Sequence, residues 1–190
     1  MSTILDPAPG TKLSPDDLLH LCDEGQGFEL VRGVLRERTK SLLAGLVAGT
    51  FLAEVQDHVD DRGWLVGSGV GFQCFPDALT VRRADAAYIR LGRLSREQVF
   101  SPDHCRVVPD LVVEVVSRHD LSNDVNAKLI DWQEAGVQLV WIVYPIHKTI
   151  HAYHADGSVK LFCISDTLIA EPVLPEFRVP AAELFRLPTA

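Results

Sequence analysis

Two nearly unbroken apolar runs, residues 109–117 (PDLVVEVVS) and residues 137–144 (VQLVWIVY), constrain the fold most strongly. β-Branched residues dominate both runs, which predicts two strands that are buried on both faces of a sheet. Residues 124–136 between them have apolar side chains at helical spacing and end at Gly136, a typical helix stop. A strand, a helix and a strand in succession form a crossover unit, so the two strands are expected to be parallel neighbours.

Shorter patterns on both sides of this unit predict a mixed α/β fold. Residues 28–38 and residues 149–164 each contain two strand-like runs around a turn, which predicts an N-terminal and a C-terminal hairpin. Residues 40–59 have the spacing of a long helix. Residues 64–75 and 79–90 predict two further strands. The sequence therefore predicts a mixed β-sheet core flanked by helices.

Size and composition suit one globular domain. The chain has 190 residues, of which 47% are hydrophobic and 23% charged. Residues 1–13 are expected to be a flexible arm, and residues 14–190 a single domain that opens with a helix capped by Ser14. No apolar run approaches the roughly 18 to 20 residues that span a bilayer, and the first residues lack the order of a secretory signal. We therefore expect a cytoplasmic protein with no membrane partner.

Charge and motif content exclude several classes of function. The formal net charge of -8 argues against a broad, non-specific nucleic-acid clamp, although it leaves room for a local basic groove or a site where a divalent ion supplies positive charge. The four cysteines form no C-x-x-C pair, so neither a zinc site nor a redox motif is indicated. The sequence also lacks H-E-x-x-H and G-x-S-x-G, which argues against a zinc hydrolase and a serine nucleophile.

Two carboxylates are the first candidates for chemistry. Glu114 lies in the middle of the first apolar run, where an ionised carboxylate needs a partner, a metal or a raised pKa. Asp85 lies in the predicted strand before it. If these strands pair, both carboxylates can point to one face and bind a hard cation such as Mg²⁺. The alternatives are a buried ion pair of Glu114 with an arginine, and an exposed Asp85 paired with Arg82 or Arg83.

Lys128 and Glu29 are further candidates. Lys128 either turns inward to orient water or a phosphate oxygen, or forms an ordinary surface pair with Asp124 one turn earlier. Glu29, between two apolar residues, either supports the site or faces solvent. Asp110 shares the strand face of Glu114, but beside Pro109 it is expected to close the loop before the strand. Spacing alone does not decide between the two orientations of Lys128, and for Glu29 it favours the solvent-facing one.

Three blocks together resemble a known family. They are FELVRGVL at residues 28–35, RRADAAYI at residues 82–89, and the long block at residues 109–145 with its acid-bearing strand, D-x-x-x-K helix, A-G-V turn and W-I-V strand. This chain resembles the bacterial restriction-endonuclease-like proteins of the Uma2 or DUF820 type, within the PD-(D/E)XK nuclease superfamily. The long block is the specific one, and the likeness extends across residues 14–165.

The resemblance implies a restriction-endonuclease-like fold, a site for Mg²⁺ or Mn²⁺, and hydrolysis of DNA phosphodiester bonds. Carried over by position, Asp85 and Glu114 match the two metal-binding acids, Lys128 matches a helix-borne lysine, and Glu29 matches the acid of the opening hairpin. Cutting both strands of a duplex needs two active sites, so a homodimer is also expected.

The sequence departs from the family pattern at several positions. Val116 stands where the superfamily has a lysine on the strand, and Ala84 stands where it has a proline before the motif aspartate. Tyr144 replaces the aspartate expected before Pro145. The histidine expected near the start of the long helix is missing. These departures keep a second hypothesis open, in which the chain is a catalytically inactive DNA-binding or protein-interaction module of the same fold.

Overall fold

Within residues 11–59 and 62–186, which the computed structural model describes, six strands form a mixed sheet in the order β3-β4-β5-β6-β7-β8. Of these strands, only β5 and β6 run parallel, and all other neighbouring pairs are antiparallel. The mixed sheet flanked by helices confirms the predicted fold class. The strands are β3 (Gly63–Gly67), β4 (Ala86–Arg90), β5 (Leu111–Val115), β6 (Leu139–Tyr144), β7 (Thr149–His154) and β8 (Val159–Cys163).

The crossover predicted from the two apolar runs is confirmed. Strand β5 leads into helix α4 (Ser122–Glu134), which returns the chain to β6 beside it. All of β5 is buried, as expected for a strand rich in β-branched residues. The helix begins two residues before the predicted start at Asp124. The register pairs Leu111 with Leu139.

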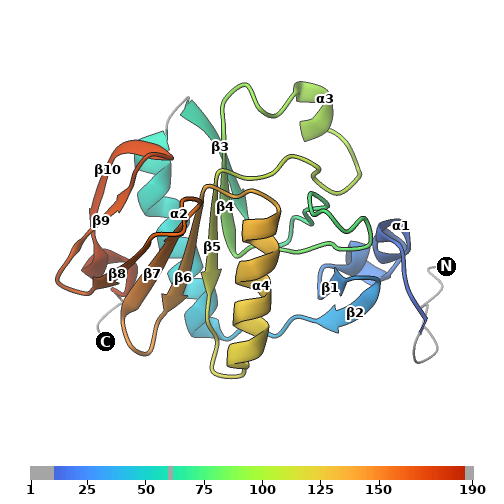
Figure 1. Cartoon of the computed structure of the whole chain (residues 1–190), viewed down its shortest axis with the longest axis horizontal. Coiled ribbons are helices and arrows are strands. Elements are labelled where there is room, and N and C mark those ends of the chain that lie inside the picture. The colour runs from blue at the N-terminus through green and yellow to red at the C-terminus, as the bar shows by residue number, and fades with distance from the viewer. Residues whose placement is uncertain (1–10, 60–61, 187–190) are drawn as a thin grey trace.

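Helices cover both faces of the sheet (Figure 1). The long helix α2 (Leu42–Val59) packs on one face, where Phe51 meets Trp141 edge to face. Helix α4 packs on the other face, where Trp132 contacts Phe72 and Phe75. Each face therefore has its own hydrophobic core, and a polar side chain on either face must find a partner within a helix-covered layer.

Two smaller sheets flank the large one. Strands β1 (Phe28–Val31) and β2 (Val34–Glu37) form the first small sheet, which is the predicted N-terminal hairpin. The predicted C-terminal hairpin is formed by β7 and β8 within the large sheet. Strands β9 (Thr167–Ala170) and β10 (Leu174–Pro180) form a further antiparallel pair. The short helical elements are α1 (Pro15–Leu19), η1 (Cys22–Gly25), α3 (Arg96–Val99) and α5 (Ala181–Leu184).

The strands predicted at residues 64–75 and 79–90 are shorter than expected. Strand β3 ends at Gly67 and β4 begins at Ala86, and residues 68–85 between them carry isolated bridges rather than a ladder. One such bridge joins Val81 to Leu30, so this segment attaches the N-terminal hairpin to the large sheet. The local sequence of a segment cannot show which partner it pairs with, so the length of both strands was overestimated.

Most of the expected N-terminal arm, residues 1–10, lies outside the described residues. Leu13, the last residue of that arm, is buried and donates its amide hydrogen to the Gly33 carbonyl at 2.8 Å. The chain is thus already attached to the N-terminal hairpin one residue before the Ser14 cap. No helix in residues 11–59 or 62–186 combines the length and apolar character needed to cross a bilayer.

Candidate active site

The register between β4 and β5 places Asp85 beside Glu114. The β4–β5 ladder ends where Ala86 pairs with Val113, so Asp85 directly precedes β4 and Glu114 directly follows Val113 in β5. The Asp85 amide donates to the Val113 carbonyl at 3.1 Å, and Asp85 Oδ2 accepts the Val115 amide hydrogen at 2.7 Å. Asp85 is thus bound to the backbone on both sides of Glu114. Both carboxylates are buried.

Glu114 is held by two residues of α4. Its Oε1 accepts a hydrogen bond from Trp132 Nε1 at 2.9 Å, and its Oε2 accepts one from Lys128 Nζ at 3.1 Å. Lys128 and Trp132 are four residues apart and therefore share one helix face. The alternative in which an arginine neutralises Glu114 is wrong, because the partners are an ammonium group and an indole.

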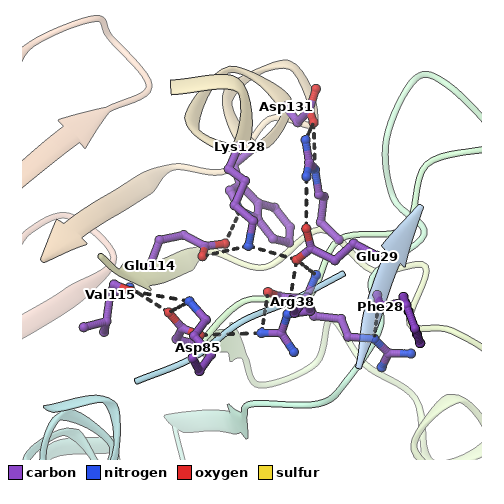
Figure 2. A network of polar contacts seen from close by, with 12 residues as sticks. Phe28, Glu29, Arg38, Asp85, Glu114, Val115, Lys128 and Asp131 are labelled. Atoms are coloured by element: carbon purple, nitrogen blue, oxygen red, sulfur yellow. Dashed lines mark hydrogen bonds and ion pairs between the residues drawn. The ribbon is translucent and has the colours of Figure 1, made fainter. Parts of the chain in front are cut away.

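Lys128 lies between two acids. Figure 2 shows its Nζ in contact with both Glu29 and Glu114. The nitrogen is 2.9 Å from Glu29 Oε1 and 3.1 Å from Glu114 Oε2, and the side chain is 18% exposed. The inward orientation is therefore the observed one, and no hydrogen bond or ion pair joins Lys128 to Asp124 in the described structure. One ammonium group joins strand β1, strand β5 and helix α4.

Glu29 connects this group to a second set of charges. The side chain is buried, so the solvent-facing alternative for it is wrong. Its Oε2 lies 3.0 Å from Arg82 Nη1, and its Oε1 accepts from the Arg83 amide at 3.0 Å. Arg82 in turn pairs with Asp131 of α4 at 2.5 Å. Arg38 completes the ring of cations around Glu29, with Nε 3.5 Å from Oε1.

Asp85 is paired with residues that follow β2. Its Oδ2 lies 2.8 Å from Lys40 Nζ and accepts the Val115 amide hydrogen at 2.7 Å, while its Oδ1 lies 3.5 Å from Arg38 Nη2. Figure 2 shows Asp85 facing Val115 at the end of β5, below Glu114. The alternative of an exposed Asp85 paired with Arg82 or Arg83 is therefore wrong.

Lys40 makes a second contact at the same place. Its Nζ also donates to the Val115 carbonyl oxygen at 3.4 Å. Its side chain is 27% exposed, more than that of Lys128 or Arg38. An ammonium group therefore lies between a carboxylate oxygen and a backbone carbonyl oxygen at the end of β5.

Asp110, on the same strand face as Glu114, belongs to a different contact. It is buried and lies 2.7 Å from Arg93 Nη1, and it accepts the Arg90 amide hydrogen at 2.9 Å. It thus fixes the loop ahead of β5, as its position after Pro109 predicts.

The electrostatic environment separates the roles of the three central groups. Burial alone raises the pKa of Glu29, but Lys128 and the two neighbouring arginines outweigh it and lower this pKa to about 2. Burial lowers the pKa of Lys128, but the surrounding carboxylates raise it beyond its usual range. Burial raises the pKa of Glu114, with Asp85 and Glu29 adding to the effect and the nearby lysines opposing it. At neutral pH Glu29 and Lys128 are therefore charged. Of the two glutamates, Glu114 protonates more readily than Glu29 as the pH falls.

A cleft of about 420 Å³ opens above this network. Glu29, Glu114 and Lys128 reach its wall, together with Arg38 and Lys40. Asp85 does not line the cleft, although both cations that contact it do. The lining contains five acidic and five basic residues: Glu29, Glu37, Glu114, Asp120, Asp124, Arg36, Arg38, Lys40, Arg82 and Lys128.

The donor chemistry fits a divalent cation. Asp85, Glu114 and the Val115 carbonyl offer hard oxygen atoms, which Mg²⁺ and Mn²⁺ prefer. No group of three or more His, Cys, Asp and Glu side chains in the described part of the chain is arranged to hold a metal. Mg²⁺ commonly takes only one or two carboxylates and keeps several waters, so two acids and a carbonyl could hold it.

The sequence indicated the acids better than their partners. The structure brings Asp85, Glu114, Lys128 and Glu29 into one network, but the sequence reading missed Arg38, Lys40, Asp131 and Trp132. Asp131 and Trp132 follow Lys128 by three and four residues, so helical spacing was a usable signal for them. Arg38 and Lys40 gave no such signal, because they reach the acids from the end of the hairpin across the fold.

Comparison with known proteins defines first the class and then the family. The fold matches the solved structure of a protein from Anabaena variabilis described as "a putative nuclease belonging to DUF820", with a TM-score of 0.76 and an identity of 15%, over 91% of this chain and 97% of that one. The chain thus has a nuclease-like fold. The model of the family Uma2, described as "Putative restriction endonuclease", matches residues 15–182, and the chain belongs to this family. A search of curated proteins finds no significant match.

Proposed function

We propose that this protein is a metal-dependent endonuclease that hydrolyses DNA phosphodiester bonds in the cleft above Glu114. The observation that carries the proposal is the pairing of Lys128 with Glu114 at 3.1 Å and Glu29 at 2.9 Å, directly beside Asp85. The Glu29 and Glu114 carboxylates and the Lys128 ammonium group line the cleft, and acids beside a cation suit phosphoryl chemistry. Membership of the Uma2 family and the nuclease-like fold support the same reaction class.

Each residue has a separate part in this proposal. Asp85 and Glu114 would hold Mg²⁺ or Mn²⁺, and such an ion, when bound, activates water and offsets charge on the phosphoryl group. Lys128 donates hydrogen bonds to the attacking water or to a phosphate oxygen, and because its raised pKa keeps it protonated it does not act as the base that deprotonates the water. Glu29 keeps Lys128 at the cleft wall, and Trp132 fixes the orientation of the Glu114 carboxylate.

The charge of the cleft explains why the metal matters for substrate. The acidic and basic residues in its lining balance, so the protein alone presents no net positive surface there to a phosphate backbone. A divalent ion held by Asp85 and Glu114 would shift that balance toward the phosphate. DNA binding and metal binding are therefore expected to depend on each other.

Nicking of supercoiled plasmid in the presence of Mn²⁺ tests the proposal. We expect nicking by the parent protein and a loss of more than about a hundredfold in Asp85→Asn and Glu114→Gln, because each variant removes a proposed metal ligand with little change in shape. The control is Glu134→Gln, which neutralises an exposed acid of α4. Undiminished nicking by both site variants would reject the assignment.

One observation favours the second candidate function, a catalytically inactive DNA-binding or interaction module. Every acid of the network already has a cationic partner, and Asp85 has two, Lys40 and Arg38. Thermal unfolding with millimolar Mn²⁺ separates the two functions, because a metal that binds only the folded state raises the midpoint by mass action. No shift, together with no nicking, would favour the inactive module.

A further inference from the structure

The position of the Lys40 ammonium group resembles that of a bound cation. Its nitrogen lies 2.8 Å from Asp85 Oδ2 and 3.4 Å from the Val115 carbonyl oxygen. These two oxygen atoms, with the carboxylate of Glu114, the residue before Val115 in β5, are also the hard donors available to a divalent ion. Lys40 is close enough to Glu114 for its charge to lower the pKa of that acid.

Of the cations in the network, Lys40 is the one best able to leave. Lys128 is enclosed by Glu29, Glu114 and helix α4, and the Arg38 side chain is only 9% exposed. Lys40 instead lies in the connection between β2 and α2, with its side chain 27% exposed and on the cleft wall. Its flexible four-carbon stem allows the charge to move into the cleft without movement of the backbone.

We propose that the Lys40 ammonium group occupies the position that a divalent ion would take beside Asp85 and the Val115 carbonyl oxygen, and that the ion binds by displacing this ammonium group. This inference rests on the proposed metal site of Asp85 and Glu114. In the absence of metal, the Lys40 ammonium group neutralises the buried Asp85 carboxylate. Without it, the more distant Arg38 would be the main counter-charge of Asp85.

Displacement has a consequence for substrate. Once released, the Lys40 ammonium group stays on the cleft wall, because its residue lines the cleft. There it is free to pair with a phosphate oxygen of a bound nucleic acid strand. Metal binding therefore converts an internal counter-charge into a substrate contact, and it does so without a change of fold.

Competition between an ammonium group and a metal predicts how affinity changes on substitution. We expect Mn²⁺ to bind Lys40→Met about tenfold or more tightly than the parent protein, since the metal no longer has to break a charged hydrogen bond. Lys40→Gln, which is neutral but polar, should also bind more tightly. Lys40→Arg keeps the competing charge, so its affinity should not exceed that of the parent.

The measurement is Mn²⁺ binding to the full chain by calorimetry, with paramagnetic resonance of free Mn²⁺ as a second readout. Lys148→Met serves as the matched control, because Lys148 is an exposed lysine of the turn between β6 and β7. Circular dichroism establishes that each variant folds, and Lys40→Gln provides the test if Lys40→Met does not fold.

The outcomes separate this inference from the proposed function. Equal or weaker Mn²⁺ binding by Lys40→Met and Lys40→Gln, with binding lost in Asp85→Asn, would overturn the role of Lys40 and leave the metal site standing. Mn²⁺ binding by none of the proteins would overturn both. Tighter binding by the neutral variants and not by Lys40→Arg or Lys148→Met supports the displacement.

Discussion

Buried side chains of this site stay ionised because oppositely charged neighbours offset the cost of burying a charge. Glu29 is buried, yet its pKa falls to about 2 because Lys128, Arg82 and Arg38 surround it. An isolated carboxylate at that position would instead have a raised pKa. The ion pairs at Glu29 thus stabilise the folded state only while Glu29 is ionised, which makes its contribution dependent on pH.

Substitution of Glu29 by Gln tests this coupling. A pKa lowered from 4.5 to about 2 stabilises the folded state above pH 4.5, and the stabilisation is lost as the pH falls from 4.5 toward 2. We expect Glu29→Gln to lower the free energy of unfolding by about 3 kcal/mol at pH 7, and by less than half of that near pH 3. Urea unfolding at both pH values measures it.

Glu37→Gln is the matched control for this experiment. Glu37 belongs to the same hairpin but is exposed, so its substitution should change the free energy of unfolding by less than about 0.5 kcal/mol at either pH. A difference for Glu29→Gln that stays constant between pH 7 and pH 3 would contradict the assigned role of its charge.

At the scale of elements, helix α4 does most to organise the site. Lys128, Asp131 and Trp132 all come from its buried face, and they reach strand β5 and the segment before β4. The helix also provides the aromatic contacts of Trp132 with Phe72 and Phe75. The same packing therefore fixes the core and the orientation of the Glu114 carboxylate.

The two buried tryptophans allow a direct test of this organisation. Trp132 Nε1 donates to Glu114, whereas Trp141 Nε1 has no hydrogen-bond partner within the described residues. Replacing either by Phe removes similar apolar area, but only Trp132→Phe removes a hydrogen bond to a carboxylate. We expect Trp132→Phe to lose about 1.5–3 kcal/mol more stability than Trp141→Phe. Equal losses by chemical denaturation would show that the bond does not stabilise the fold.

How far the sequence predicts each element depends on whether its signal is local. The β5–α4–β6 crossover was predictable because continuous β-branched runs and helical spacing are properties of the segment itself. Residues 79–85 were also predicted as strand, but Val81 bridges to Leu30 of the N-terminal hairpin and Arg82 bridges to Phe72, and neither joins the ladder of the large sheet. The acids were predictable from their apolar surroundings. Arg38 and Lys40 were not, since only the tertiary fold brings a hairpin end to Asp85.

At the scale of the whole molecule, the formal net charge of -8 opposes contact with nucleic acid. Glu114, Lys128 and Lys40 line the same cleft, and the acidic residues in its lining equal the lysines and arginines in number. Cleavage of both strands of a duplex would then need two copies of the chain, and the homodimer stays a prediction that sedimentation can test. An endonuclease of the kind proposed would have to gain positive charge at the cleft before it holds a phosphate backbone well.

Binding of a short DNA duplex in Ca²⁺ and in EDTA tests this requirement. Ca²⁺ takes the same oxygen ligands as Mg²⁺ but with longer and more flexible coordination, so it can fill the site without assembling the geometry for cleavage. We expect affinity measured by fluorescence anisotropy to rise at least about tenfold in Ca²⁺, because the ion adds positive charge beside Lys128 and displaces Lys40 toward the phosphates. Sodium chloride at equal ionic strength is the control and should weaken binding. The same rise in Asp85→Asn would place the effect of Ca²⁺ elsewhere on the protein or on the DNA, since that variant lacks the carboxylate the ion is proposed to use.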